Sequence, residues 1–409
     1  MATLNKKKSS GHLLVDIIIM GGGIAGLWLL NRLRHSGYNA VLFECGDLGC
    51  GQTIKSQGII HGGLKYALNG SLTSAASAIA DMPGRWRACL DGNGEIDLME
   101  ARMLSPYHYL WSTSKLSSHF ATFFASKVLR NRVEAVPKQD YPMIFKNPAF
   151  KGSLYRLDEI VLDVPSVIKA LAKPQISRIS RVDWGKDARM EIDNRGYILS
   201  VELKAPGRPV MSLNAQRYVF TGGIGNEQLL REMAQQQPAM QRRPLHMVIV
   251  KHRNKASLFG HCLGTGPRPR VTITSHPSSD GYTVWYLGGD IAETGVKRDT
   301  ENQIKAAQKE LQTLLPWVGL PEARWSTLTI ERAEPVQRFG QRPDTSFARE
   351  VKNAIVAWPT KMALSPRLSD EIILLLHRAN IQPLYPAVDM PEYFHPPEIA
   401  KPIWEELQG

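Results

Sequence analysis

An α/β fold with a second, α+β domain is predicted from three features of the 409-residue sequence. A continuous apolar run at 15–20 ends in three glycines, and an apolar helical pattern begins directly afterwards at Ile24. A second apolar run, 217–220, also ends in a glycine turn, and several β-rich runs lie within 244–296. Buried parallel strands read as continuous apolar runs, whereas successive β-rich runs favour an antiparallel sheet.

The first glycine turn has the spacing G-x-G-x-x-G, formed by Gly21, Gly23 and Gly26 between the strand and the helix. In this motif the first glycine allows a tight turn, the second lets a pyrophosphate approach the backbone, and the third lets helix and strand pack closely. The start of the helix, at Ile24 and Ala25, presents free N–H groups and the positive end of the helix dipole, which favour an anion.

A second strand, 40–43, follows the helix and ends in Glu44, whose carboxylate could accept hydrogen bonds from a ribose. Gly37 provides the helix stop before this strand. Strand, glycine turn, helix and acidic residue therefore occur in the order typical of a Rossmann-type dinucleotide site. The alternative is a glycine-rich turn inside a core.

Composition is that of a soluble globular protein, with 43% hydrophobic and 22% charged residues. Lys6–Lys8 followed by an apolar stretch imitate a signal peptide, but Asp16 and the glycines argue against both a signal and a membrane span. Four cysteines show neither C-x-x-C nor metal-ligand spacing, so reduced thiols in the cytoplasm are expected.

A formal net charge of +12 is compatible with an acidic substrate, an anionic membrane surface or nucleic acid. The basic residues are scattered and no RNA-binding signature is present, so we expect no nucleic-acid partner. A cytoplasmic location is predicted, with peripheral association at the inner face of a membrane as the alternative.

The segment after Glu44 is rich in glycine and in polar side chains, which suits an extended cofactor lying along backbone amides. Candidate cofactor contacts in it are Gln52, Thr53, Ser56, Gln57 and Gly58. Its continuation, S-Q-G-I-I-H-G-G-L-K-Y at 56–66, resembles the flavin-contacting segment of the FAD-dependent oxidoreductases related to D-amino-acid oxidase. Among these it is most similar to FAD-dependent glycerol-3-phosphate dehydrogenase, with the match reaching 61–66. The resemblance implies FAD as the cofactor.

Further along the chain, 72–90 is expected to be a helix broken at Pro83, and the stretch 91–100 to turn into a strand. Residues 101–150, with four prolines among aromatics, favour irregular or mixed structure. The stretch 154–172 resembles the strand and helix that return the chain to the FAD domain in this family. Asp163 and Pro165 suit the start of that helix.

The second half of the chain continues with a polar hairpin, 189–203, and then with the apolar run 217–220 and its turn at Gly222. This turn resembles the second nucleotide-proximal turn of the family, and a helix is expected from Asn226. An amphipathic helix is predicted at 301–315, and a strand at 354–358 precedes a turn and a helix that starts near Pro366.

Together these elements predict a discontinuous Rossmann-type FAD-binding domain and an antiparallel-sheet substrate domain. The predicted boundaries are 13–85, 151–235 and 336–380 for the FAD-binding domain, 86–150 and 236–335 for the substrate domain, and 381–409 for a proline-rich C-terminal segment. That last segment is expected to fold back over the core, with docking of a protein partner as the alternative.

Lys361 is a candidate for tuning the flavin, because the family places a lysine or a helix end near the flavin N1, where reduction adds negative charge. The sequence has Trp-Pro-Thr-Lys at 358–361, where the dehydrogenases that it resembles carry a Gly-Gly-Lys turn. The lysine is thus kept while the backbone before it changes. The alternative is an exposed lysine at a helix start.

Candidate substrate contacts are Arg332, Arg338 and Arg342, in the strand and loop that this family directs at the active site. A guanidinium there could hold a carboxylate or phosphate with two hydrogen bonds, and surface arginines in a loop are the alternative. His61 could act as a general base, hold the flavin covalently or pack against the ring, and packing is the first expectation.

The sequence therefore predicts an FAD-dependent oxidase or dehydrogenase that transfers hydride from an alcohol or amine carbon to flavin N5. The leading substrate is small and anionic, a 2-hydroxy acid or a glycerol-3-phosphate-like molecule, and the electron acceptor is oxygen or a quinone. An amine or amino-acid oxidase is the second interpretation. An RNA-modifying flavoprotein and a non-catalytic flavoprotein subunit remain as alternatives of other classes.

Overall fold

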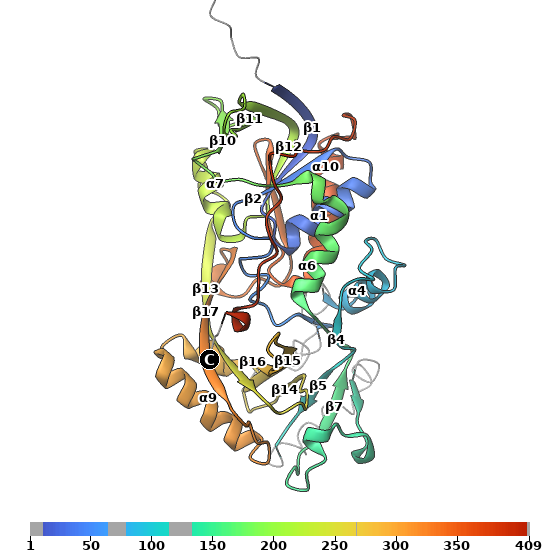
Figure 1. Ribbon diagram of the computed structural model, residues 1–409, viewed down its shortest axis with the longest axis vertical. Helices are drawn as coiled ribbons and strands as arrows, with labels where there is room; N and C mark the ends of the chain where they lie inside the picture. The colour runs from blue at the N-terminus through green and yellow to red at the C-terminus, as the bar shows by residue number, and fades with distance from the viewer. Residues whose placement is uncertain (1–10, 64–78, 114–132, 267, 407–409) are drawn as a thin grey trace, which may run out of the picture.

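The computed structural model describes residues 11–63, 79–113, 133–266 and 268–406. Two eight-stranded sheets lie one above the other along the long axis of the molecule (Figure 1). The first sheet has the order β10-β11-β12-β1-β2-β9, and β19 and β18 branch from β12. Its strands are β1 (Gly11–Met20), β2 (Ala40–Glu44), β9 (Ile179–Arg181), β10 (Ala188–Ile192), β11 (Ile198–Leu203), β12 (Met211–Phe220), β18 (Phe347–Val351) and β19 (Ala354–Trp358).

The centre of the first sheet is parallel and buried on both faces. β1 pairs in parallel with β2 and with β12, and β12 pairs in parallel with β19. Helices from distant parts of the sequence cover one face, where α1 (Ile24–His35) contacts both α6 (Val164–Ala172) and α10 (Ser365–Arg378) (Figure 1). This is the discontinuous Rossmann-type architecture that the sequence predicts, because segments from the beginning, middle and end of the chain build one sheet.

The second sheet has the order β17-β13-β16-β15-β14-β5-β7-β6, and all its pairs are antiparallel except β5 with β14. α9 (Thr300–Leu314) packs against β13 and β17. The strands are β5 (His108–Trp111), β6 (Val133–Ala135), β7 (Leu154–Leu157), β13 (Met240–His252), β14 (Gly260–Cys262), β15 (Val271–Pro277), β16 (Thr283–Gly288) and β17 (Arg324–Pro335).

A small third sheet joins the two large ones. It has the order β3-β8-β4 and contains β3 (Ile59–Ile60), β4 (Met103–Ser105) and β8 (Ile160–Leu162). β8 follows β7 of the second sheet after a two-residue turn, while β3 belongs to the segment that leaves the first sheet after β2. Within the described residues, the further helices are α4 (Met82–Leu90), α7 (Asn226–Glu232) and α8 (Asp290–Gly295), with short 3-10 turns η2 (Lys138–Asp140), η3 (Met143–Phe145), η4 (Lys173–Arg178), η5 (Gly223–Gly225), η6 (Arg338–Gly340), η7 (Met362–Leu364) and η8 (Ile403–Glu405).

Several local predictions are confirmed. The α1 helix spans Ile24–His35, the hairpin of β10 and β11 forms, and the Asp163 side chain caps α6 by accepting the Ser166 N–H at 3.3 Å. Others are wrong. β1 begins at Gly11 and not at residue 15, and β12 begins at Met211 and not at residue 217, because the two strands pair over their whole lengths.

The helix predicted at 72–90 is interrupted directly before Pro83, because residues 80 and 81 form a turn between the helical residue 79 and α4. Pro83 lies in the first turn of α4, where a missing N–H costs nothing. The stretch 91–100 contains no strand, and the next strand is β4. Residues 72–78 of the predicted helix lie outside the described residues. The predicted domain boundaries stay a prediction.

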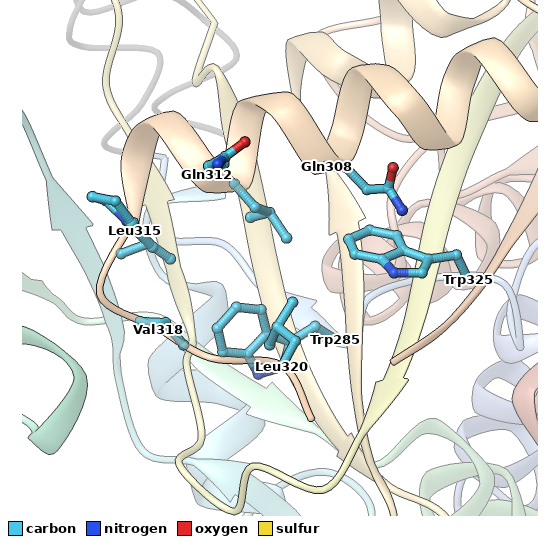
Figure 2. Close-up of a pocket in the computed structure, with 9 residues that line it drawn as sticks. Trp285, Gln308, Gln312, Leu315, Val318, Leu320 and Trp325 are labelled. Atoms are coloured by element: carbon cyan, nitrogen blue, oxygen red, sulfur yellow. The ribbon is translucent and has the colours of Figure 1, made fainter. Parts of the chain in front are cut away.

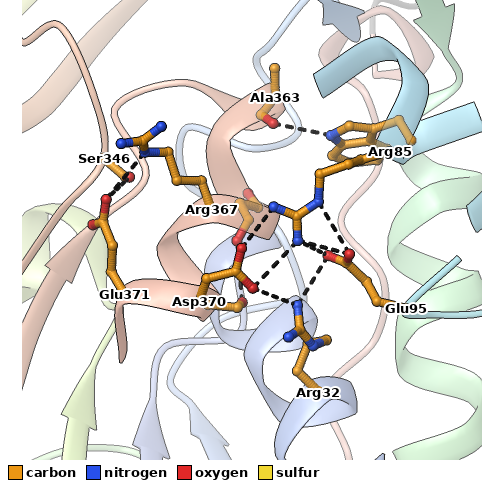
Figure 3. A network of polar contacts seen from close by, with 11 residues as sticks. Arg32, Arg85, Glu95, Ser346, Ala363, Arg367, Asp370 and Glu371 are labelled. Carbon is orange, nitrogen blue, oxygen red and sulfur yellow. Dashed lines mark hydrogen bonds and ion pairs between the residues drawn. The ribbon is translucent and has the colours of Figure 1, made fainter. Parts of the chain in front are cut away.

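A network of ion pairs ties α1, α4 and α10 together on the covered face of the first sheet (Figure 3). Arg85 bonds Glu95 at 2.6 Å and Asp370 at 2.7 Å, and Arg32 contacts the same two carboxylates at 3.1 and 2.9 Å. Burial would lower the pKa of Arg85, but the hydrogen bonds from Asp370 and Glu95 outweigh it and raise that pKa. The network fixes helices that are distant in sequence.

The C-terminal segment folds back over the core, as predicted from the sequence. Backbone N–H of Leu384 donates to Asp16 at 3.0 Å beside β1, and Lys251 of β13 donates to the carbonyl of Trp404 at 3.0 Å. The segment thus contacts both large sheets. Among the residues that the structure describes, no helix combines the length and apolar character needed to cross a bilayer.

Candidate functional site

The two glycine turns meet at the ends of β1 and β12. Gly21 has φ +118°, a backbone conformation that residues other than glycine rarely adopt. A Cβ there would lie 2.6 Å from the backbone of Thr221 and Gly222. A Cβ on Gly26 would lie 2.0 Å from the carbonyl oxygen of Gly21. The N–H of Gly222 donates to the Asn226 side chain at 2.8 Å. The first turn therefore requires glycine at both positions for close backbone packing.

The start of α1 is open to an anion. Gly23 is its N-cap, and the helix carries neither a side-chain cap nor an acidic residue in its first turn. The Ile24 N–H contacts the hydroxyl of Thr53 at 3.1 Å, and that hydroxyl is also the one atom near a Cβ built on Gly23, at 3.2 Å. Backbone N–H groups at this end, including that of Ala25, fit the pyrophosphate of a dinucleotide.

Glu44 is buried and held in place by the backbone around the turn. One carboxylate oxygen accepts the N–H of Gly22 at 2.5 Å, and the other accepts those of Cys45 and Gly46 at 2.8 and 2.9 Å. These bonds fix the carboxylate beside the glycine turn. A carboxylate can accept about four hydrogen bonds, so the oxygen facing Gly22 keeps capacity for a ribose hydroxyl.

The segment 52–58 connects the first sheet to the second. Gln52 accepts the N–H of Ala333 at 3.1 Å, Gln57 donates to the carbonyl of Tyr286 at 2.8 Å, and Ser56 contacts the sulfur of Met362 at 3.6 Å. Gly58 has φ +70°, and a Cβ there would lie 2.1 Å from the carbonyl of Leu162. Gln52, Gln57 and Ser56 thus serve packing between the sheets as well as any cofactor contact.

Lys361 is buried and precedes η7, the turn that leads into α10. η7 contacts β3, so Lys361 lies near the segment 52–60. The preceding residue, Thr360, has φ +60°, and its hydroxyl donates to the carbonyl of Thr345 at 3.0 Å. Threonine thus adopts here the left-handed conformation that glycine favours. The buried position is not that of an exposed helix-start lysine.

The three candidate arginines occupy different surroundings. Arg332 on β17 is mostly buried, pairs with Glu293 at 3.2 Å and donates to the carbonyl of Arg243 at 3.0 Å. Burial first, and then the charges of Arg243 and Arg342, lower the pKa of Arg332 to about 10. Arg342 is half-buried, whereas Arg338 is exposed in η6. The structure therefore keeps Arg332 and Arg342 partly buried and leaves Arg338 at the surface.

His61 follows β3 directly and contacts the carboxylate of Glu159, a residue that was not predicted from the sequence. Its Nδ1 lies 3.1 Å from Glu159, and the backbone N–H of Gly62 donates to the other oxygen of Glu159 at 3.1 Å. The register of β3 with β8 sets Ile60 opposite Ile160, which places His61 opposite Glu159. The one sequence signal was an acidic residue flanked by two apolar strands.

Two further histidines surround Glu159. Nε2 of His261, on β14, lies 3.7 Å from the carboxylate, and the ring of His108, on β5, lies 4.3 Å from that of His261. Glu159, His108 and His261 are all buried. Burial would raise the pKa of Glu159, but the imidazoles of His61, at 3.1 Å, and of His261, at 3.7 Å, outweigh burial and hold that pKa well below its usual range. Glu159 is therefore a carboxylate, not a neutral acid.

A separate hollow lies at the far end of the second sheet, between α9 and the strands β16 and β17 (Figure 2). It has a volume of about 270 Å³ and is lined by Trp285, Gln308, Leu311, Gln312, Leu315, Pro316, Val318, Leu320 and Trp325. Figure 2 shows the two tryptophans below the helix. None of the predicted site residues lines this hollow.

Comparison with known proteins agrees with this geometry. The family model described as FAD dependent oxidoreductase matches residues 16–357. The FAD-dependent oxidoreductase PA4991 of Pseudomonas aeruginosa is 51% identical over 391 residues, which cover 95% of this chain and 97% of that protein. Its crystal structure superposes with a TM-score of 0.82, covering 97% of this chain and 98% of that one.

More distant solved structures share the fold. Glycine oxidase of Geobacillus kaustophilus has a TM-score of 0.60 at 15% identity, covering 95% of this chain and all of that one (100%). L-α-glycerophosphate oxidase of Mycoplasma pneumoniae, solved with FAD bound, has a TM-score of 0.59 at 12% identity, covering 95% and 99%. The match over most of the chain, together with a turn that fits a dinucleotide, shows that this protein belongs to the family of FAD-dependent oxidoreductases related to D-amino-acid oxidase.

Proposed function

We propose that this oxidoreductase oxidises the alcohol carbon of a small anionic molecule, either a 2-hydroxy acid or a glycerol-phosphate-like compound. The observation that carries the proposal is the pair of partly buried arginines, Arg332 on β17 and Arg342 in the loop that follows, whose positive charges act on one another. Two guanidinium groups held near one another are stabilised when an anion binds between them. A carboxylate or phosphate of the substrate is such an anion.

The position of these arginines supports the assignment. Ala333, the residue after Arg332, bonds Gln52 in the predicted cofactor segment. Arg332 pairs with Glu293, and we assign to it the positive field around the substrate; we assign direct contact with the substrate to Arg342, in the loop after β17. We assign Arg338, which is exposed, no part in binding.

Alcohol oxidation removes a hydride from carbon and a proton from oxygen. FAD, when bound, accepts the hydride at flavin N5. We assign the proton to His61, because its place after β3, next to η7, and its contact with a carboxylate suit a general base better than a packing residue. Gly21–Gly26, Glu44, Thr53 and Gly222 are the residues that we propose for holding the nucleotide half of FAD, and Lys361 for the flavin half.

A substrate screen under anaerobic conditions tests the proposal. The purified holoenzyme is mixed with L-glycerol 3-phosphate, with 2-hydroxy acids such as lactate and malate, and with amino acids such as glycine and D-alanine. Loss of the flavin absorbance near 450 nm then reports reduction whatever the natural electron acceptor is. Bleaching by a hydroxy compound supports the proposal, whereas bleaching by amino acids alone supports the amine oxidase alternative.

A further inference from the structure

We propose that Glu159 is a positioning residue that holds His61 in the tautomer able to take a proton from the substrate. The inference rests on the proposed alcohol oxidation for its role in turnover, but the geometry of the residues stands by itself. No motif singles out Glu159 in the sequence, and it comes to the site through the turn between β7 and β8.

Glu159 is a charged carboxylate in the folded protein. Its side chain is 2% exposed, and it is surrounded by a backbone N–H donor and two histidines. A buried carboxylate is stable only when it is paired and hydrogen-bonded. Both oxygens have hydrogen-bond partners, Gly62 on one and His61 on the other, and His261 lies 3.7 Å from the second, so the group is an acceptor at neutral pH.

The carboxylate of Glu159 determines the tautomer of His61. A neutral imidazole has one N–H and one basic nitrogen, and the hydrogen bond at one nitrogen decides which is which. Since the carboxylate accepts, Nδ1 of His61 must donate across the 3.1 Å contact. Nε2 is then the basic nitrogen. This arrangement is the His–carboxylate pair known from hydrolases, where the carboxylate orients the ring and stabilises the imidazolium.

Protons and electrons balance in the proposed oxidation of the substrate alcohol. The substrate C–H bond breaks and its electron pair leaves as hydride to the flavin; the O–H bond breaks and its proton goes to Nε2 of His61; and the C–O bond becomes C=O. His61 becomes positive in this step, and the negative Glu159 stabilises that charge. His261 lies on the other side of the carboxylate and is fixed by a 2.8 Å hydrogen bond between its Nδ1 and the Thr272 hydroxyl.

A divalent-metal site is the competing use of two histidines and a carboxylate, since their ligand atoms lie within 4.8 Å of one another. The hydrogen bonds favour the positioning role instead. The N–H of Gly62 already occupies one oxygen, and donation from His61 to the other oxygen explains the 3.1 Å contact without an ion. Metal analysis of the purified holoenzyme decides between the two uses, because one equivalent of tightly bound metal that requires Glu159 would overturn the proposal.

The direct test is nitrogen-15 NMR of the histidine-labelled holoenzyme, with the His61 signal identified by its loss in His61→Asn. In the wild type we expect Nδ1 to carry the proton at neutral pH. Glu159→Gln keeps size and an acceptor for Gly62 but must turn its NH₂ group to His61, so the tautomer should reverse. A proton on Nε2 in the wild type, or an unchanged tautomer in Glu159→Gln, would overturn the inference.

Asp158→Asn is the matched control, because the neighbouring carboxylate is exposed and pairs with Arg87. It should leave the tautomer and turnover unchanged. If the screen identifies a hydroxy substrate, Glu159→Gln should slow flavin reduction by about 100-fold, the lower end of what a general base contributes, and shift the midpoint of the pH–rate profile to lower pH. Equal rates and equal profiles would contradict the proposal.

The NMR result separates the failure of this inference from the failure of the proposed function, because it needs no turnover. If Glu159→Gln loses FAD, the wild-type tautomer alone decides, and Glu159→Asp, which keeps the charge on a shorter side chain, should retain the Nδ1 proton. A reversed tautomer in Glu159→Asp would count against the carboxylate as the group that orients the ring.

Discussion

A Cβ atom on Gly26 would lie 2.0 Å from the carbonyl oxygen of Gly21, which is far shorter than van der Waals contact. Close packing of α1 on β1 thus depends on that glycine. We expect Gly26→Ala to destabilise the fold, with poor recovery of protein that contains FAD. Solubility and the melting temperature of the purified variant measure this effect.

Gly23 should behave differently, because a Cβ there approaches Thr53 alone, at 3.2 Å. Gly23→Val is expected to fold but to lose FAD, since its side chain occupies the space of the pyrophosphate. Circular dichroism and the flavin released on denaturation separate the two variants. A yellow Gly23→Val protein with normal flavin content would contradict the assigned cradle.

Lys361 is expected to raise the reduction potential of the flavin. A unit charge about 4 Å from reduced N1 is worth on the order of 4 kcal/mol at an effective dielectric of 20, and half of that is about 40 mV for a two-electron couple. Lys361→Met should therefore lower the potential by roughly this amount while FAD stays bound. Dye equilibration measures it, with exposed Lys309→Met on α9 as the control. Equal potentials in wild type and Lys361→Met would remove the lysine from the flavin site.

Substrate affinity should depend on the planar fork of Arg342. Charge-assisted hydrogen bonds contribute roughly 1.5 to 3 kcal/mol, and lysine keeps the charge but loses the second bond. We expect Arg342→Lys to lower kcat/KM about tenfold or more on the substrate that the screen identifies. Arg349→Lys, on the exposed β18 strand, is the control and should have wild-type kinetics. Unchanged kinetics in both Arg342→Lys and Arg332→Lys would show that no arginine clamp exists.

Buried His276 should make the protein less stable in acid. Burial lowers the pKa of His276 to about 4. The charge of Asp163 raises this pKa and that of Arg102 lowers it, both by less than burial does. The unfolded chain binds this proton near pH 6.5 and the folded chain only near pH 4, so stability is full above about 6.5 and declines as pH falls toward 4. The loss is about 3 kcal/mol at most.

His276→Phe keeps a ring against Trp404, which lies 4.8 Å from the histidine ring. The melting temperature of this variant should fall less between pH 7 and pH 5 than that of the wild type. Exposed His395→Gln should follow the wild type. Parallel curves for all three proteins would contradict a buried neutral histidine.

Patterns within short segments made the first domain predictable. The apolar run 15–20, the glycine turn and Glu44 lie close together in sequence, and the structure places them as the Rossmann motif requires. Glu159 and His261 were not predictable in this way. They reach His61 only through the pairing of β3 with β8 and of β14 with β5, which joins segments about 100 to 200 residues apart.

The same reason explains the errors in the elements. Lengthening of β1 to Gly11 follows from its pairing with β12, a partner 200 residues away that local propensity does not reveal. The backbone at Thr360 was also not predictable. The dehydrogenases that the sequence resembles carry glycine there, but Thr360 adopts the positive φ, and its hydroxyl donates to the carbonyl of Thr345. Local sequence could not show that hydrogen bond.

Matched substrate pairs show whether the enzyme takes hydride from an alcohol carbon or from an amine carbon. The holoenzyme is mixed anaerobically with glycerol 3-phosphate and its 2-amino analogue, with lactate and alanine, and with malate and aspartate, and the rate of flavin bleaching is recorded for each. Because the members of a pair share size and anionic group, a difference reports the oxidised bond. We predict that one hydroxy member bleaches the flavin and that its amino partner does not. Bleaching by an amino member, with every hydroxy partner inert, would contradict the account.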